Sequence, residues 1–301
     1  MSRPPTFVPP ACARARVLET ARGPFAVLDA APPGGRPVSG TALLLPGYTG
    51  SKEDFIAMLE PLTDAGYRVV AVDGRGQYET AGPDDPRAYA QRELALDVLA
   101  QAEALRGDGT PLHLLGHSLG GQIARAAVLT DHAPFASLTL MSSGPAEVAA
   151  PQREKIKLLG DALGALGMDE VWTAMRALDP PEDADDPLRG GDREDLRQRW
   201  LRHNPAQLTA TGRQLSTEPD RVAELAALRP ALPCHVLSGE RDDTWPVPLL
   251  DAMAARLGAH RTVVAGAEHS PNTDRPRETS EAVAAFWDRA GRPGNAAEAR
   301  A

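Results

Sequence analysis

The chain has 301 residues, of which 42% are hydrophobic, 24% charged and 4% aromatic, and its formal net charge is −9 at pH 7. This composition is typical of a globular protein and excludes the disordered and fibrous classes. The acidic charge argues against a nucleic-acid partner, because phosphate backbones are bound by clustered Lys and Arg. No apolar stretch reaches the length of a membrane span, and the N-terminus lacks the continuous apolar segment of a secretory signal, so we expect a cytoplasmic location.

The first 145 residues alternate between strand-like and helix-like patterns. Two short strands around an Arg-Gly turn are expected over residues 14–30. Further strands are expected at 41–47, 67–74, 111–116 and 135–145, and helices at 51–66, 85–107 and 118–131. Because the elements alternate with short connections, this part of the sequence predicts an α/β fold with a doubly wound, mostly parallel sheet.

The pattern changes after Pro145. Residues 147–228 contain successive amphipathic helical patterns and no strand-like run, and strand and helix patterns return from residue 229. We therefore divide the chain into a first core part (1–146), a helical lid or cap (147–228) and a second core part (229–301). Such an insertion is expected to cover the carboxyl ends of the strands, where open α/β sheets bind ligands.

One motif carries the chemistry. Gly116-His117-Ser118-Leu119-Gly120 matches G-x-S-x-G and stands between an apolar strand and a helical pattern, which is the setting of a nucleophile elbow. Glycines allow the sharp turn that lifts the serine hydroxyl above the sheet, at a helix N-terminus that favours negative charge. The alternative is a glycine-rich turn with an incidental serine. We expect Ser118 to be a nucleophile.

A serine needs a base and an orienting acid to be nucleophilic near neutral pH. Of the seven histidines, His269 alone directly follows a strand at the edge that holds the elbow. His117, inside the elbow, is expected to point away from the mouth of the serine. For the acid, the loop after the strand at 232–239 offers Glu240, Asp242 and Asp243. The order Ser, acid, His along the chain is the one that α/β-type hydrolases use.

With these residues the chain resembles the serine hydrolases of the α/β-hydrolase fold, esterase-like or lipase-like with a helical lid, over roughly residues 41–288. The resemblance implies Asp242 as the acid, because Gly239, Asp242 and Pro246 match the family pattern G-x-x-D-x-x-x-P. It also implies that Asp73, Arg75 and Gly76 form the family's Asp-x-Arg-Gly turn, which we interpret mainly as holding that turn.

The oxyanion hole of such an enzyme consists of two backbone N–H donors. The resemblance implies the N–H of Leu119, the residue after the nucleophile, and that of Tyr48, in the loop after an early strand. Family members usually carry His-Gly in that loop, whereas this chain has Pro46-Gly47. Because the donor is a backbone group, the change leaves the predicted hole intact.

The sequence therefore predicts a serine hydrolase that cleaves a carboxylic ester, or a related lactone or thioester, through an acyl-enzyme, without cofactor or metal. Apolar residues of the lid favour a small-molecule acyl substrate with an apolar part; they are Leu158, Leu159, Leu163, Leu166, Met168, Val171, Trp172, Met175 and Leu178. The alternatives left open are an acyltransferase or carbon–carbon bond hydrolase on the same triad, and a non-catalytic small-molecule-binding protein.

Overall fold

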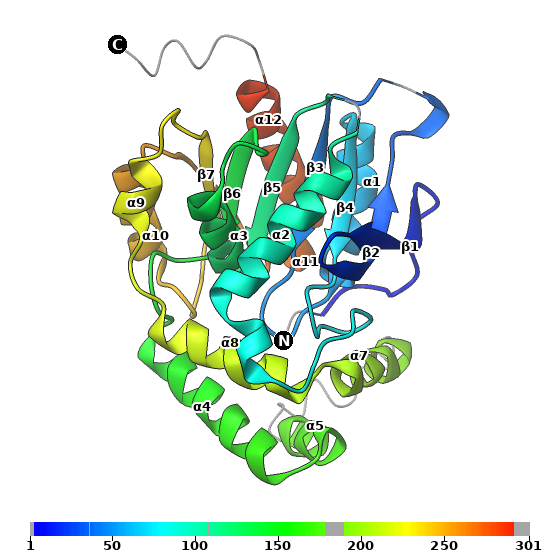
Figure 1. Ribbon diagram of the computed structural model, residues 1–301, viewed down its shortest axis with the longest axis vertical. Coiled ribbons are helices and arrows are strands. Elements are labelled where there is room, and N and C mark those ends of the chain that lie inside the picture. The colour runs from blue at the N-terminus through cyan, green and yellow to red at the C-terminus, as the bar shows by residue number, and fades with distance from the viewer. Residues whose placement is uncertain (1–2, 36, 108, 178–189, 292–301) are drawn as a thin grey trace.

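The computed structural model describes residues 3–35, 37–107, 109–177 and 190–291 (Figure 1). Its centre is one sheet of eight strands in the order β1-β2-β4-β3-β5-β6-β7-β8. The strands are β1 (Ala13–Thr20), β2 (Gly23–Ala30), β3 (Gly40–Leu45), β4 (Tyr67–Val72), β5 (Leu112–His117), β6 (Ser137–Met141), β7 (Cys234–Gly239) and β8 (His260–Val264). Strand β2 is antiparallel to β1 and β4, and all other neighbours are parallel. The predicted α/β class and mostly parallel sheet are confirmed.

Helices cover both faces of the sheet, so its central strands are buried on both sides. Within β3, the side chains of Leu43 and Leu45 join one hydrophobic cluster and that of Leu44 joins the other. Helices α2 (Gln91–Leu105), α3 (Leu119–Thr130) and α10 (Val247–Leu257) pack on the first face, and α1 (Ile56–Asp64) and α12 (Pro276–Ala290) on the second. Burial on both faces explains why these strands are continuous apolar runs.

Between β6 and β7 the described chain is helical. Its helices are α4 (Ala150–Ala165), α5 (Met168–Ala177), α7 (Gly190–Arg202), α8 (Pro205–Thr217) and α9 (Val222–Ala226). Figure 1 shows α4, α5, α7 and α8 gathered at one end of the sheet. Tyr48, which follows the carboxyl end of β3, donates a hydrogen bond of 2.9 Å to the carbonyl of Leu208 in α8. This group of helices therefore lies against the carboxyl-end loops of the sheet.

Two expected helices are interrupted at their N-terminal ends. Residues 51–66 form a 3-10 turn (Lys52–Phe55) followed by α1, and residues 85–107 form a 3-10 turn (Pro86–Tyr89) followed by α2. At the second break Ala90 has ψ 141°, which is outside the helical region. Among the helices within the described ranges, none has the length and apolar character needed to cross a bilayer.

Candidate active site

The G-x-S-x-G motif forms a sharp turn between β5 and α3. Ser118 has φ 54° and ψ −117°, a conformation that non-glycine residues rarely adopt and that costs about 1–3 kcal/mol. Glycines at both flanking positions are required, because a Cβ at Gly116 would meet the backbone of Gly120, and one at Gly120 would meet the backbone of Leu45. The turn places Ser118 immediately before the N-terminus of α3.

Ser118, His269 and Asp242 form a continuous hydrogen-bonded relay. The Oγ of Ser118 lies 3.1 Å from Nε2 of His269, and Nδ1 of His269 lies 3.0 Å from Oδ1 of Asp242. The three residues come from the turns after β5, β8 and β7, so the parallel sheet brings their loops to one edge. The spacing of both contacts is that of a nucleophile, a base and an orienting acid.

Asp242 is the carboxylate that faces His269. Its Oδ1 also accepts hydrogen bonds from the backbone N–H groups of Thr244 (2.8 Å) and Trp245 (3.1 Å). Burial acts to raise the pKa of Asp242, but His269 and these two N–H groups outweigh it, so the pKa lies below its ordinary value. Asp243 instead accepts a hydrogen bond of 2.6 Å from Gln152 of α4.

The two expected oxyanion donors come from two segments next to the serine. Leu119 is the first residue of α3, and Tyr48 follows Gly47, at which a Cβ would lie only 3.3 Å from that of Ser118. Within the part of the chain that the structure describes, neither backbone N–H donates to a protein acceptor.

His117 belongs to this site, so the expectation that it points away is wrong. Its Nε2 lies 2.8 Å from the backbone carbonyl oxygen of His269, and the two rings are 5.2 Å apart between centroids. Since a carbonyl only accepts, Nε2 carries the proton. Burial lowers the pKa of His117 to about 3, so the ring is neutral. The sequence signal was its place next to the nucleophile.

A cavity of about 410 Å³ opens above the relay and is lined by Ser118, His117, His269 and Tyr48. From the helices between β6 and β7 it receives Gln152, Lys155, Ile156 and Leu215. Of the nine apolar residues named for the inserted helices, eight are described and none lines this cavity, while Leu178 lies outside the described residues. Several of the eight, Trp172 and Val171 among them, pack instead in a separate cluster within these helices.

The Asp-x-Arg-Gly turn binds neighbouring segments of the chain through hydrogen bonds and ion pairs. Asp73 is fully buried and accepts hydrogen bonds from the backbone N–H (2.8 Å) and the ammonium (2.8 Å) of Lys52. Arg75 binds Asp97 of α2, and neither Asp73 nor Arg75 lines the cavity at Ser118. Across the described residues, no cluster of three or more His, Cys, Asp or Glu side chains is placed to hold a metal ion.

Comparisons with known proteins agree with this architecture. A family model described as "Alpha/beta hydrolase family" matches residues 42–282. A putative carbamate hydrolase RutD of Variovorax paradoxus is 37% identical over 109 residues, 36% of this chain and 40% of that protein, so the match spans less than half of the relative. A 2-hydroxy-6-oxononadienedioate/2-hydroxy-6-oxononatrienedioate hydrolase of Cupriavidus pinatubonensis is 30% identical over 212 residues, 68% of this chain and 69% of that protein.

A solved structure shares the same fold. The thermophilic esterase of Thermogutta terrifontis superimposes with a TM-score of 0.72 at 21% identity, covering 93% of this chain and all of the esterase. The family model spans most of the sheet and all three residues of the relay, and the eight-stranded topology agrees with it. The chain therefore belongs to the α/β-hydrolase family.

Proposed function

We propose that the protein is a serine hydrolase that cleaves a carboxylic ester, or a related acyl bond such as a lactone or thioester, through an acyl-enzyme. The observation that carries the proposal is the unbroken relay from Ser118 through His269 to Asp242, with contacts of 3.1 and 3.0 Å. The nucleophile is an alcohol, which suits acyl transfer.

In the first half of the reaction, His269 Nε2 accepts the proton of Ser118 as Oγ attacks the acyl carbon. The ionised Asp242 stabilises the imidazolium that forms and holds its Nδ1–H. The N–H groups of Leu119 and Tyr48 bind the oxyanion, aided by the N-terminus of α3. The tetrahedral intermediate collapses when the imidazolium gives its proton to the leaving alcohol or thiol, and the acyl group stays on Ser118.

In the second half, His269 removes a proton from a water molecule that attacks the acyl-enzyme. The same two N–H groups bind the second oxyanion, and the imidazolium returns the proton to Ser118 Oγ as the carboxylic acid leaves. The helices over the cavity act as a lid in this scheme. Their contribution is to shield a serine that is only 6% exposed and to shape the space for the acyl and alcohol groups.

A serine-directed fluorophosphonate tests the proposal. The intact protein is incubated with the probe, any adduct is located by peptide mass, and Ser118→Ala, His269→Ala and the half-buried His132→Ala are treated in parallel. We expect an adduct on Ser118 in the wild type and in His132→Ala. Labelling and ester hydrolysis should fall about 10³-fold or more in the two triad variants.

Two outcomes separate the rival functions. Labelling of Ser118 together with transfer of the acyl group to an added alcohol, in preference to water, would replace hydrolysis by acyl transfer. No labelling, or the same labelling in heat-unfolded protein, would refute an activated serine and favour a protein that only binds small molecules. An ester rate reduced less than tenfold by Ser118→Ala would also refute the assignment.

A further inference from the structure

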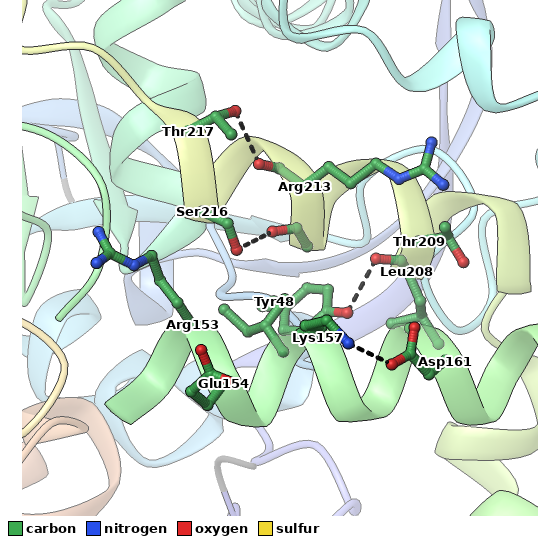
Figure 2. A pocket seen from close by; sticks show the side chains of 13 residues that line it. Tyr48, Arg153, Glu154, Lys157, Asp161, Leu208, Thr209, Arg213, Ser216 and Thr217 are labelled. Atoms are coloured by element: carbon green, nitrogen blue, oxygen red, sulfur yellow. Dashed lines mark hydrogen bonds and ion pairs between the residues drawn. The ribbon is translucent and has the colours of Figure 1, made fainter. Parts of the chain in front are cut away.

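A second cavity lies between helices α4 and α8, outside the relay. Its volume is about 370 Å³, and Figure 2 shows its lining side chains on the two helices, with Tyr48 between them. The lining combines an aromatic ring, two aliphatic side chains and two glycines with a charged or hydroxylic rim. The apolar part consists of Tyr48, Ile156, Gly160, Leu208 and Gly212.

The two cavities are neighbours. Tyr48 and Ile156 line both the cavity at Ser118 and the cavity between the helices. Tyr48 is fixed in this position by its hydrogen bond to the Leu208 carbonyl and by close approach to α8, where a Cβ at Gly212 would lie 2.8 Å from the tyrosine oxygen. The second cavity therefore borders on the cavity at Ser118 where these two side chains lie.

Several polar groups around the second cavity are already bonded to other groups of the protein. Lys157 pairs with Asp161 at 2.8 Å within α4, and Arg153 pairs with Glu147. The hydroxyls of Ser216 and Thr217 donate to carbonyls of their own helix, at 3.0 and 2.9 Å (Figure 2). Glu154, Thr209 and Arg213 also belong to the polar part of the lining. The ring, the two aliphatic side chains and the two glycines form the apolar part, which suits an alkyl chain.

Gly160 keeps this volume open. It lies one helical turn after Ile156 on α4, and a Cβ built there would have no heavy atom within 4 Å. Glycine is the poorest helix former after proline. Since no neighbouring atom lies close to the Cβ position, close packing does not require a glycine here. Gly164, one turn further, also has nothing within 4 Å of a Cβ, but it does not line this cavity.

We propose that the cavity between α4 and α8 receives an alkyl chain of the substrate, which extends from the carbonyl at Ser118 past Ile156 and Tyr48. The inference rests on the proposed function and adds the substrate class, an ester with an extended apolar chain. The chain is carried either on the acyl side or on the alcohol side of the ester, and the two arms of the experiment below distinguish these sources.

Gly160→Phe fills the cavity, and Gly164→Phe is the matched control on the same helix. The acyl arm compares p-nitrophenyl octanoate with p-nitrophenyl acetate, and the alcohol arm compares octyl acetate with ethyl acetate. Each buried methylene contributes about 0.8 kcal/mol, or roughly fourfold, so displacing two methylenes costs about 16-fold. We expect Gly160→Phe to lower kcat/KM at least tenfold for the long ester of one arm, with both short esters within twofold and Gly164→Phe unchanged.

Binding to catalytically disabled protein tests the cavity independently of turnover. In the Ser118→Ala background, octanoate and octanol are titrated calorimetrically with and without Gly160→Phe or Gly164→Phe. Weaker binding of one of them in the Gly160 variant alone supports the site. Equal effects of the two phenylalanines, or no effect of either in kinetics and titration, overturns it. Failure of the proposed function appears differently, as absent hydrolysis and labelling in the wild type.

Discussion

At the scale of single residues, His117 is the least expected member of the site. Its neutral ring donates from Nε2 to the carbonyl of His269, and so restrains the backbone that carries the base. The Nδ1 atom is buried without a hydrogen bond and faces Gly47, at which a Cβ would lie 3.2 Å away. His117 therefore links the elbow, the loop of Tyr48 and the loop of His269, as a positioning residue.

Replacing His117 by Leu removes this donor while filling similar space. We expect kcat to fall about 10–100-fold with little change in KM, since a displacement of about 1 Å at a catalytic group costs this much. His117→Gln, whose amide can donate to the same carbonyl, should recover much of the loss. Steady-state kinetics on an ester checks the prediction, and equal losses in both variants, without recovery by Gln, would contradict it.

The residue-level prediction from sequence succeeded where strand order decides position. The position of Ser118 after β5 and of His269 after β8 follows from the fact that parallel strands end at one edge. The direction of a side chain within a tight turn does not follow from such reasoning, and His117 was misplaced for this reason. Asp242 and Asp243 were adjacent candidates, and only the family pattern favoured Asp242. In the structure Asp242 contacts His269 and Asp243 contacts Gln152, and neither partner is adjacent in the sequence.

At the scale of elements, the α7 helix is joined to the core by a buried ion pair. Arg199 Nη1 lies 2.7 Å from Oδ1 of Asp54, and both side chains are fully buried. Just beyond α7, His203 Nε2 lies 3.1 Å from the carbonyl of Gly50. In contrast, α4 has no buried residue. Helix α7 is thus attached to the core by a buried ion pair, whereas α4 lies at the surface of the helical group.

Arg199→Met leaves Asp54 buried without this cation. The free energy of unfolding should fall by about 3–5 kcal/mol, because removing one partner of a buried pair strands the other charge. Urea unfolding measures the change. Adding Asp54→Leu to Arg199→Met should recover most of it, and Arg202→Met, which breaks a partly exposed pair with Glu79, should cost less than about 1 kcal/mol. Similar losses for Arg199 and Arg202 would contradict the role of burial.

The same contacts explain why one helix was predicted too long. The pattern at 51–66 has helical spacing, and Ser51 looks like an N-cap. In the structure the Ser51 hydroxyl donates to Glu53 (2.6 Å), and Lys52 and Asp54 turn inward to pair with Asp73 and Arg199. These partners lie far away in the sequence, so the spacing of apolar residues could not predict the contacts. In the structure a 3-10 turn replaces the first turn of the expected helix.

At the scale of the whole molecule, the alternation of strands and helices was sufficient to predict the sheet. The residues that line the cavities could not be predicted in the same way. The sequence named nine apolar residues in the inserted helices, and none of the eight that are described lines the cavity at Ser118. Val171 and Trp172 are buried between the helices, and Ile156 and Leu215, which are not among the nine, contribute apolar lining at Ser118. Helical spacing identifies an apolar face but not the neighbour that it contacts.

The stability of the whole fold is expected to depend on pH. Burial lowers the pKa of four histidines, to about 4 for two of them and about 3 for the others; they are His113, His203, His117 and His235. In the unfolded chain a histidine titrates near about 6.5. Between about pH 6.5 and 4 the unfolded state therefore binds protons that the folded state does not, so stability falls as pH falls. Burial raises the pKa of Asp54 and Asp73, which opposes this change.

Burial lowers the pKa of these four histidines and of His260, and it raises the pKa of two carboxyls, so we expect the unfolded state to bind more protons than the folded state as pH falls through this range. The free energy of unfolding should then have a positive slope against pH. Urea unfolding across pH 7 to 4.5 measures this slope. His235→Gln removes one buried imidazole from β7 and should reduce the slope by about 1.4 kcal/mol per unit. An unchanged slope in that variant would mean that the buried histidines do not govern acid unfolding. A slope of opposite sign in the wild type would mean that the buried carboxyls govern the pH dependence.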